Sequence, residues 1–317
     1  MGDRFVAFRL AGDAGANAGH GLATFRGDGL AAIVAFLCGL AGGQALPGRG
    51  DGILHRVVDL VLNRAVARPT AGHVASPYRF NIGRGMEFRN IVILTGAGIS
   101  ADSGLATFRG ADGLWEGHRV EDVATPEAYR RDPQLVHQFY DARRARLGAV
   151  EPNAAHAALA RLDAEWPGEL LIVTQNVDDL HERAGAKRLL HMHGELTSGW
   201  CLACDERFLW QGPMGEKASC PACQVTGQVR PDIVWFGEMP YDMERIERAL
   251  QNADLFASIG TSGAVYPAAG FVQTARYCGA HCIEMNLEPS QGSIFFDESR
   301  MGRAKELVPA WVDDVLA

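Results

Sequence analysis

Short apolar runs that alternate with helical patterns constrain the fold of this chain more than any other feature. From residue 86 onward, the short apolar and β-branched run Asn90–Leu94 is typical of a buried parallel strand. Three further short runs resemble strands: Leu170–Thr174, Asp254–Ile259 and His281–Met285. Helical patterns cover Asp132–Leu147, Ala154–Trp166, Met243–Asn252, Ala268–Cys278 and Arg303–Leu316. Strands that alternate with helices predict an α/β domain with a doubly wound parallel sheet.

Residues 1–85 do not share this alternation. They are rich in glycine and arginine and contain neither lysine nor glutamate. Their longest apolar run, over 30–41, is shorter than the ~20 residues that a membrane-spanning helix needs. We therefore expect 1–85 to be a largely irregular, poorly ordered extension and 86–317 to be the folded domain.

Charge and cysteine content narrow the classes of partner and compartment. The net charge of −8 at pH 7 argues against nucleic acid or an anionic membrane as a partner. Seven cysteines in 317 residues are too few for a disulfide scaffold, which favours a reducing compartment and hence the cytoplasm. We expect Cys38, Cys278 and Cys282 to be ordinary buried thiols.

The other four cysteines form two C-x-x-C pairs with metal-ligand spacing. Cys201 and Cys204 form one pair, and Cys220 and Cys223 form the other after an intervening 15 residues. Two such turns supply four thiolates in the tetrahedral arrangement that suits Zn²⁺. A shell closed by four thiolates leaves no position for substrate, so we expect one structural zinc ion in a small zinc-ribbon module over 198–230.

Small and polar residues follow each predicted strand. A glycine loop, Gly96-Ala97-Gly98, comes directly after the first, and the carboxyl ends of strands in an open α/β sheet are where ligands bind. Backbone N–H groups of such a loop can hold a pyrophosphate, although a tight strand-to-helix turn explains the glycines of this loop equally well. The residues after the other strands are Gln175, Asn176, Asp178, Gly260, Thr261, Ser262, Asn286, Leu287 and Glu288.

Two histidines lie between the second strand end and the cysteine pairs. Histidine titrates near neutrality, so either His191 or His193 is a candidate general base. From the spacing alone, a zinc ligand or a solvated histidine fits each position equally well.

Taken together, the motifs resemble those of sirtuins, which are NAD-dependent protein-lysine deacylases. GAGIS at 96–100, TFRG at 107–110, QNVD at 175–178, HG at 193–194, both cysteine pairs and VWFGE at 234–238 occur in the family's order. The resemblance covers about residues 88–317 and leaves out 1–85. It implies a Rossmann-like large lobe, a small zinc-bearing lobe, and a cleft between them for NAD and acyl-lysine.

The resemblance also implies roles for individual residues. It makes His193 the catalytic base, with Asn176 and Asp178 completing the catalytic set at the nicotinamide. The positions that it assigns to NAD are Gly96, Ala97, Gly98, Ile99, Phe108, Arg109, Gln175, Asn176, Asp178, Gly260, Thr261, Ser262, Asn286, Leu287, Glu288 and Ala304. Those that it assigns to the acylated peptide are Ala124, Tyr140, Arg143, Val234, Phe236, Gly237 and Glu238.

The acyl preference rests on one helical pattern. Tyr140 and Arg143 are three residues apart and so share a helix face, where a hydroxyl and a guanidinium together can bind a carboxylate. A solvated basic face is the alternative, because Arg144 and Arg146 follow. The Tyr-x-x-Arg pattern, with the small Ala124, is similar to the signature of class III sirtuins. That similarity implies removal of succinyl, malonyl and acetyl groups, with release of nicotinamide and O-acyl-ADP-ribose.

Two other functions stay open at this point. One is NAD hydrolysis or ADP-ribosyl transfer in the same cleft, and the other is a non-catalytic zinc-ribbon binding module. The VWFGE segment favours a peptide substrate, since a peptide can pair with it as a β-strand. We expect acylated lysine side chains of proteins as substrates, no nucleic-acid or membrane partner, and a monomer.

Overall fold

The computed structural model of the chain describes residues 88–107, 115 and 117–317. The extension expected over 1–85 lies outside the described residues, and so do Cys38, Phe108 and Arg109. Within the described ranges, no helix combines the length and the apolar character needed to cross a membrane.

A six-stranded parallel sheet forms the centre of the large lobe, which confirms the predicted fold class. Its strand order is β3-β2-β1-β7-β8-β9, and every neighbouring pair is parallel. The strands are β1 (Asn90–Thr95), β2 (Glu169–Thr174), β3 (Leu189–His191), β7 (Leu255–Ile259), β8 (His281–Asn286) and β9 (Glu298–Met301). The four predicted strands are the central ones. The two edge strands, β3 and β9, were not predicted.

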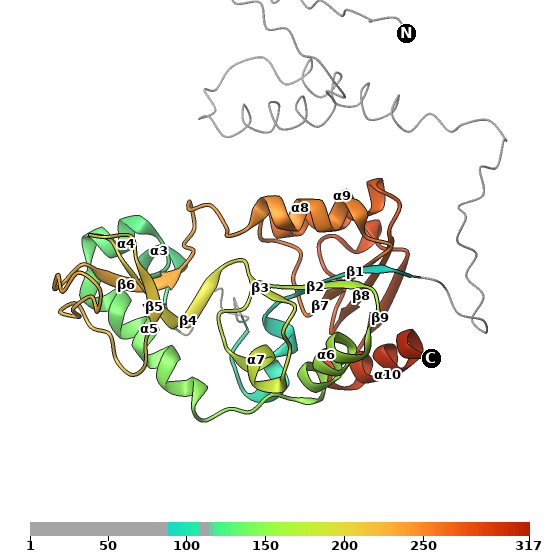
Figure 1. Ribbon diagram of the computed structural model, residues 1–317, viewed down its shortest axis with the longest axis horizontal. Helices are drawn as coiled ribbons and strands as arrows, with labels where there is room; N and C mark the ends of the chain where they lie inside the picture. The colour runs from blue at the N-terminus through green and yellow to red at the C-terminus, as the bar shows by residue number, and fades with distance from the viewer. Residues whose placement is uncertain (1–87, 108–114, 116) are drawn as a thin grey trace, which may run out of the picture. The chain divides into compact units, whose positions relative to one another are not determined.

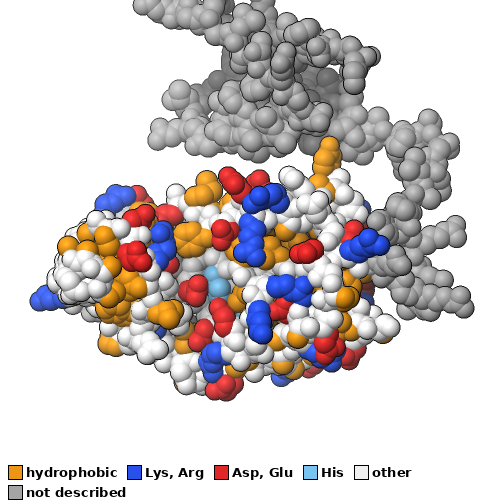
Figure 2. Space-filling view, in the orientation of Figure 1, with side chains coloured by type: hydrophobic (Ala, Val, Ile, Leu, Met, Phe, Trp, Pro, Cys, Tyr) orange, Lys and Arg blue, Asp and Glu red, His pale blue; other side chains and the backbone are white. Residues whose placement is uncertain are grey.

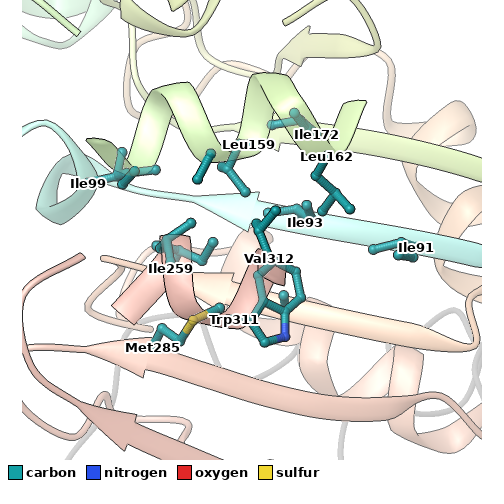
Figure 3. Packing of buried hydrophobic residues seen from close by; sticks show 14 of the residues in the cluster. Ile91, Ile93, Ile99, Leu159, Leu162, Ile172, Ile259, Met285, Trp311 and Val312 are labelled. Carbon is teal, nitrogen blue, oxygen red and sulfur yellow. The ribbon is translucent and has the colours of Figure 1, made fainter. Parts of the chain in front are cut away.

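Helices cover both faces of this sheet (Figure 1). α6 (Ala154–Glu165), α7 (Leu180–Ala184) and α10 (Ala304–Leu316) lie on one face, and α8 (Met243–Asn252) and α9 (Phe271–Tyr277) lie on the other. Alternate side chains of β1 serve the two faces, since Ile91 and Ile93 pack in one cluster and Val92 and Leu94 in the other. Figure 3 shows the first cluster, with Trp311 and Val312 of α10 against the strands.

A separate three-stranded antiparallel sheet forms the small lobe. Its order is β5-β4-β6, with β4 at Gly194–Cys201, β5 at Arg207–Leu209 and β6 at Val229–Ile233. It extends past both ends of the predicted 198–230 module, because β4 begins directly after His193. α3 (Val120–Val123), α4 (Pro126–Arg131) and α5 (Pro133–Leu147) complete this lobe, and Val136 and Tyr140 of α5 pack with Ile233 of β6.

Three predicted helices differ from the structure near their starts, and the smallest difference is at α10, which Arg303 precedes as its cap. Asp132 precedes α5 as its cap, because its side chain accepts a hydrogen bond from the Leu135 N–H at 2.9 Å and Pro133 takes the first helical position. The predicted helix over Ala268–Cys278 is divided into a 3-10 turn at Ala268–Gly270 and α9.

Candidate active site

One cleft of about 840 Å³ lies at the carboxyl ends of the parallel strands and reaches the small lobe. Its volume is within the range typical of ligand sites. The predicted NAD-site positions that line it are Gly96, Ala97, Gly98, Gln175, Asn176, Asp178, Gly260, Thr261, Ser262, Asn286, Leu287, Glu288 and Ala304. The predicted substrate positions that line it are Ala124, Tyr140, Arg143, Val234, Phe236, Gly237 and Glu238, and His193 lines it as well.

Ile99 is the one described NAD-site prediction that does not line this cleft. Its side chain is 0% exposed and belongs to the core cluster under the sheet end, where Figure 3 shows it close to Ile259. Its backbone carbonyl accepts a hydrogen bond from the Asn153 side chain at 2.8 Å. The structure therefore gives Ile99 a packing task beneath the loop, and a contact with NAD stays a prediction.

The glycines of the first loop are required by backbone packing. The N–H of Gly98 donates to the carbonyl of Gly260 at 2.8 Å, and the N–H of Gly96 donates to that of Ile259 at 3.0 Å. A Cβ at Gly98 would lie 2.7 Å from the Gly260 Cα, closer than real contacts allow. The two loops therefore meet backbone against backbone, which keeps this end of the cleft free of side chains.

A hydrogen-bonded chain joins the first and second strand ends. The Asn176 side chain donates to Ser100 Oγ, and Ser100 Oγ donates to Asp178 Oδ2, each at 3.1 Å. Asn176 and Asp178 are each 7% exposed, and burial raises the pKa of Asp178. Sequence reasoning missed the linking role of Ser100, although a hydroxyl directly after the glycine loop was a visible signal.

His193 is held so that one ring nitrogen stays basic. Its Nδ1 lies 3.2 Å from the backbone carbonyl of Gln175, and since a carbonyl only accepts, Nδ1 carries the proton and Nε2 has the lone pair. Burial lowers the pKa of His193, which favours this neutral form. The next residue, Gly194, packs closely against β6, because a Cβ there would lie 2.0 Å from the Asp232 carbonyl oxygen.

His191 supports the same loop from outside the cleft. Its Nδ1 donates to the Asn176 carbonyl at 3.0 Å, and its Nε2 contacts Glu182 Oε1 at 2.6 Å. Although burial opposes the charged form, the Glu182 carboxylate holds the pKa of His191 above its usual value. Neither histidine belongs to the cysteine group, whereas His191 groups with Glu182 and Glu195, whose possible ligand atoms lie within 4.8 Å of one another.

Aromatic side chains enclose the predicted acyl pocket. Tyr140 is fully buried, and burial raises the pKa of its phenol above the ordinary range. The Arg143 guanidinium carbon lies 4.3 Å from the centre of the Trp115 ring, so the arginine faces an aromatic wall. Arg144, in contrast, is buried against the Leu196 carbonyl and Asp141, which contradicts the picture of a solvated basic face.

The predicted peptide-binding segment bonds largely to its own protein. The Val234 N–H donates to the His193 carbonyl at 2.9 Å, and the Phe236 N–H donates to the Ala124 carbonyl at 3.0 Å. The Glu238 carboxylate accepts from the Trp235 N–H at 2.9 Å and pairs with Arg230. Gly237 has open space on its Cβ side, with no atom within 4 Å.

The four predicted metal ligands meet at the far end of the small sheet. The sulfurs of Cys201 and Cys223 are 3.7 Å apart, as are those of Cys204 and Cys220, and all four lie within 4.8 Å of one another. Tetrahedral zinc with bonds of about 2.3 Å places sulfurs roughly 3.8 Å apart, so this group fits one Zn²⁺.

The other two described cysteines differ in exposure. Cys282 is buried as predicted, whereas Cys278 is exposed, so that prediction was wrong. Cys278 is the capping residue that follows α9 at the surface.

Comparison with known proteins identifies the family. A sequence model of the Sir2 family matches residues 96–267. A relative from Shewanella oneidensis, named NAD-dependent protein deacylase, is 57% identical over 232 residues, or 73% of this chain and 96% of the relative. A solved complex of a Sir2 homologue with NAD is 37% identical at a TM-score of 0.67. The match covers 73% of this chain and 92% of that protein. A solved Sir2 protein bound to a myristoylated histone peptide is 31% identical at a TM-score of 0.58. The match covers 72% of this chain and 92% of that protein. Since the family match spans more than half of the chain and the relative is matched almost in full, this chain belongs to the Sir2 family.

Proposed function

We propose that this chain is an NAD-dependent protein-lysine deacylase that removes succinyl, malonyl and acetyl groups and releases nicotinamide and O-acyl-ADP-ribose. The observation that carries the proposal is a single cleft lined by His193, Asp178 and Arg143. A proton acceptor, a buried carboxyl group and a cation for the acyl end thus open onto one space. The name of the Shewanella relative and the ligands of the two solved complexes support the same activity.

The cleft residues fit a dinucleotide. Glycine backbone at two strand ends leaves room for phosphates, and Asn176 with Asp178 offers an amide and a carboxyl to the carboxamide of nicotinamide. When bound, NAD would supply the ribose that takes the acyl group and the nicotinamide that leaves. Gln175, which donates to Thr261 Oγ1 at 3.0 Å, would border the nicotinamide ribose.

His193 has the form that a general base requires. Its Nδ1–H is held by the Gln175 carbonyl, so the Nε2 lone pair would take the proton of a ribose hydroxyl as that hydroxyl attacks the acyl carbon. Burial keeps the ring neutral before the step. The Val234 N–H, bonded to the His193 carbonyl at 2.9 Å, ties the base to the peptide-binding segment.

The acid limb of the pH profile tests the state of His193. Because the pKa of His193 is lowered, the acid limb of kcat/KM for an acyl peptide is expected to be centred below pH 6.5, the usual histidine value. Initial rates from pH 5 to pH 8 measure this. An acid limb centred above pH 6.5 would contradict the assignment. The variant His191→Gln identifies such a limb, since the pKa of His191 is displaced upward instead.

Arg143→Met tests the proposed acyl preference. A guanidinium that binds the carboxylate of a succinyl group makes charge-assisted hydrogen bonds, so its loss is expected to lower the succinyl-to-acetyl ratio of kcat/KM about 10- to 100-fold. Steady-state rates on matched succinyl- and acetyl-lysine peptides give that ratio.

Arg146→Met is the matched control for this test. Arg146 is an exposed residue of the same helix, outside the residues that line the cleft, so its replacement is expected to leave the ratio as it is. An Arg143→Met enzyme with an unaltered ratio would refute the proposed carboxylate pocket.

The partners and the cellular location are predicted from the sequence alone. Substrate proteins with acylated lysines follow from the proposed reaction. A cytoplasmic location, a monomeric state and the lack of nucleic-acid and membrane partners stay predictions. On the face shown in Figure 2, acidic and basic side chains are interspersed, without a continuous basic stripe.

A further inference from the structure

We propose that Trp235 is a positioning residue that fixes the direction of the Tyr140 hydroxyl, and that it thereby sets the preference for acyl chains ending in a carboxylate. This inference rests on the proposed deacylase function and adds a residue to its specificity pocket. It starts from a buried contact between α5 and the segment that follows β6, whose two members are 95 positions apart in the sequence.

The contact has a defined direction. The Trp235 Nε1 lies 3.0 Å from the Tyr140 Oη, and both side chains are buried. An indole N–H can only donate, so the phenol oxygen must accept this bond. Among the described residues, Trp235 is the hydrogen-bond partner of the Tyr140 hydroxyl. The proton of that hydroxyl is thus directed away from the indole and toward another acceptor.

A carboxylate is the acceptor that suits this arrangement. Tyr140 and Arg143 line the same cleft, and burial keeps the phenol protonated by raising its pKa. A hydroxyl donor beside a guanidinium matches the oxygens of a carboxylate, whereas an acetyl group offers nothing at that depth. Without the indole N–H, the phenol proton is no longer held in this direction, and part of the binding energy for the carboxylate is lost.

Trp235 itself is held by a partly buried ion pair. The Arg230 guanidinium carbon lies 3.3 Å from the centre of the Trp235 ring, and its nitrogens pair with Glu238 at 2.7 and 3.0 Å. Glu238 also accepts a hydrogen bond from the backbone N–H of Trp235. One carboxylate therefore holds both the backbone of the tryptophan and Arg230, which stacks on its ring. The Glu238 carboxylate thus stabilises the turn over 235–238 and the position of Trp235.

Trp235→Phe tests the inference through the ratio of two activities. The expected result is a succinyl-to-acetyl ratio of kcat/KM about three- to tenfold lower than in the wild type, with the change mainly in the KM for succinyl peptide. Replacement of Trp235 by benzothienylalanine, which keeps the shape of the indole but lacks the N–H, should lower the ratio to a similar extent. This second variant removes the hydrogen bond even if Trp235→Phe folds poorly.

Trp200→Phe is the matched control. Trp200 also donates its indole N–H, to Asp205 at 2.7 Å, and its ring lies 5.0 Å from the Arg230 guanidinium carbon, but it does not line the cleft. Its replacement is expected to leave the ratio unchanged. In a Tyr140→Phe background, Trp235→Phe should cause no further fall in the ratio, since the hydroxyl that it orients is already gone.

Three results separate the inference from the proposed function. A parallel fall of both activities with a constant ratio would assign Trp235 a purely structural role and overturn the inference. An undiminished ratio in the benzothienylalanine variant would do the same. A wild-type protein that removes neither acyl group would instead refute the deacylase proposal on which the inference stands.

Discussion

His193→Ala is expected to lower the turnover number on acyl-lysine peptides by about 10²–10⁴-fold. The variant removes the proton acceptor, because Nδ1 of this ring is bonded to the Gln175 carbonyl and Nε2 carries the lone pair that is available in the cleft. The loss should appear in kcat rather than in the affinity for NAD, since the ring acts on a proton during the chemical step. Steady-state kinetics on an acetyl- or succinyl-lysine peptide measure it.

Two accompanying measurements give the His193→Ala result its meaning. The thermal-shift response to NAD and the zinc content should match those of the wild type, because the ring belongs to neither the core clusters nor the cysteine group. Full turnover in this variant would refute the assignment of the base.

Cys220→Ser is expected to abolish zinc binding and, with it, nearly all activity. Cys220 is fully buried in the four-cysteine group at the far end of the small sheet. A structural zinc ion contributes roughly 10 kcal/mol or more to the folding of its module. Cys201 ends β4, and His193 directly precedes that eight-residue strand, so metal and base are roughly 25 Å apart along it. The effect on turnover is therefore transmitted through the fold.

Cys278→Ser is the control for the zinc variant. Cys278 is exposed and lies outside the four-cysteine group, so the metal content, melting temperature and rate should stay at wild-type values. Atomic emission on purified protein gives the zinc content, and thermal denaturation gives the stability. A Cys220→Ser protein that keeps one zinc per chain and its activity would show that the four thiolates do not form the site.

The central strands and their ends were predictable because buried parallel strands carry a local signal. Apolar residues dominate β1, β2 and β7 and alternate with polar ones in β8, and the topology of a parallel sheet brings the carboxyl ends of these strands together. β9 escaped prediction because its residues, Glu298–Met301, alternate between half-buried and exposed positions at the edge. β3 escaped because three residues are too short a run to recognise.

Contacts between distant segments could not be read from the pattern of residues. Nothing local in the sequence indicates that Trp235 donates to Tyr140 or that Arg143 lies against Trp115, because folding alone brings these segments together. The same holds for Glu238, which the motif assigns to substrate but whose carboxylate Arg230 engages. Motifs thus located the pocket, and the structure supplied the directions of its hydrogen bonds.

Mass spectrometry of the nucleotide products tests the central proposal most directly. The protein is incubated with NAD and a succinyl-lysine peptide, and in parallel with NAD alone. The predicted result is nicotinamide together with O-succinyl-ADP-ribose and free lysine peptide, formed only when the acyl peptide is present. Unconsumed NAD in both samples, or ADP-ribose formed equally without peptide, would contradict an acyl transfer in this cleft.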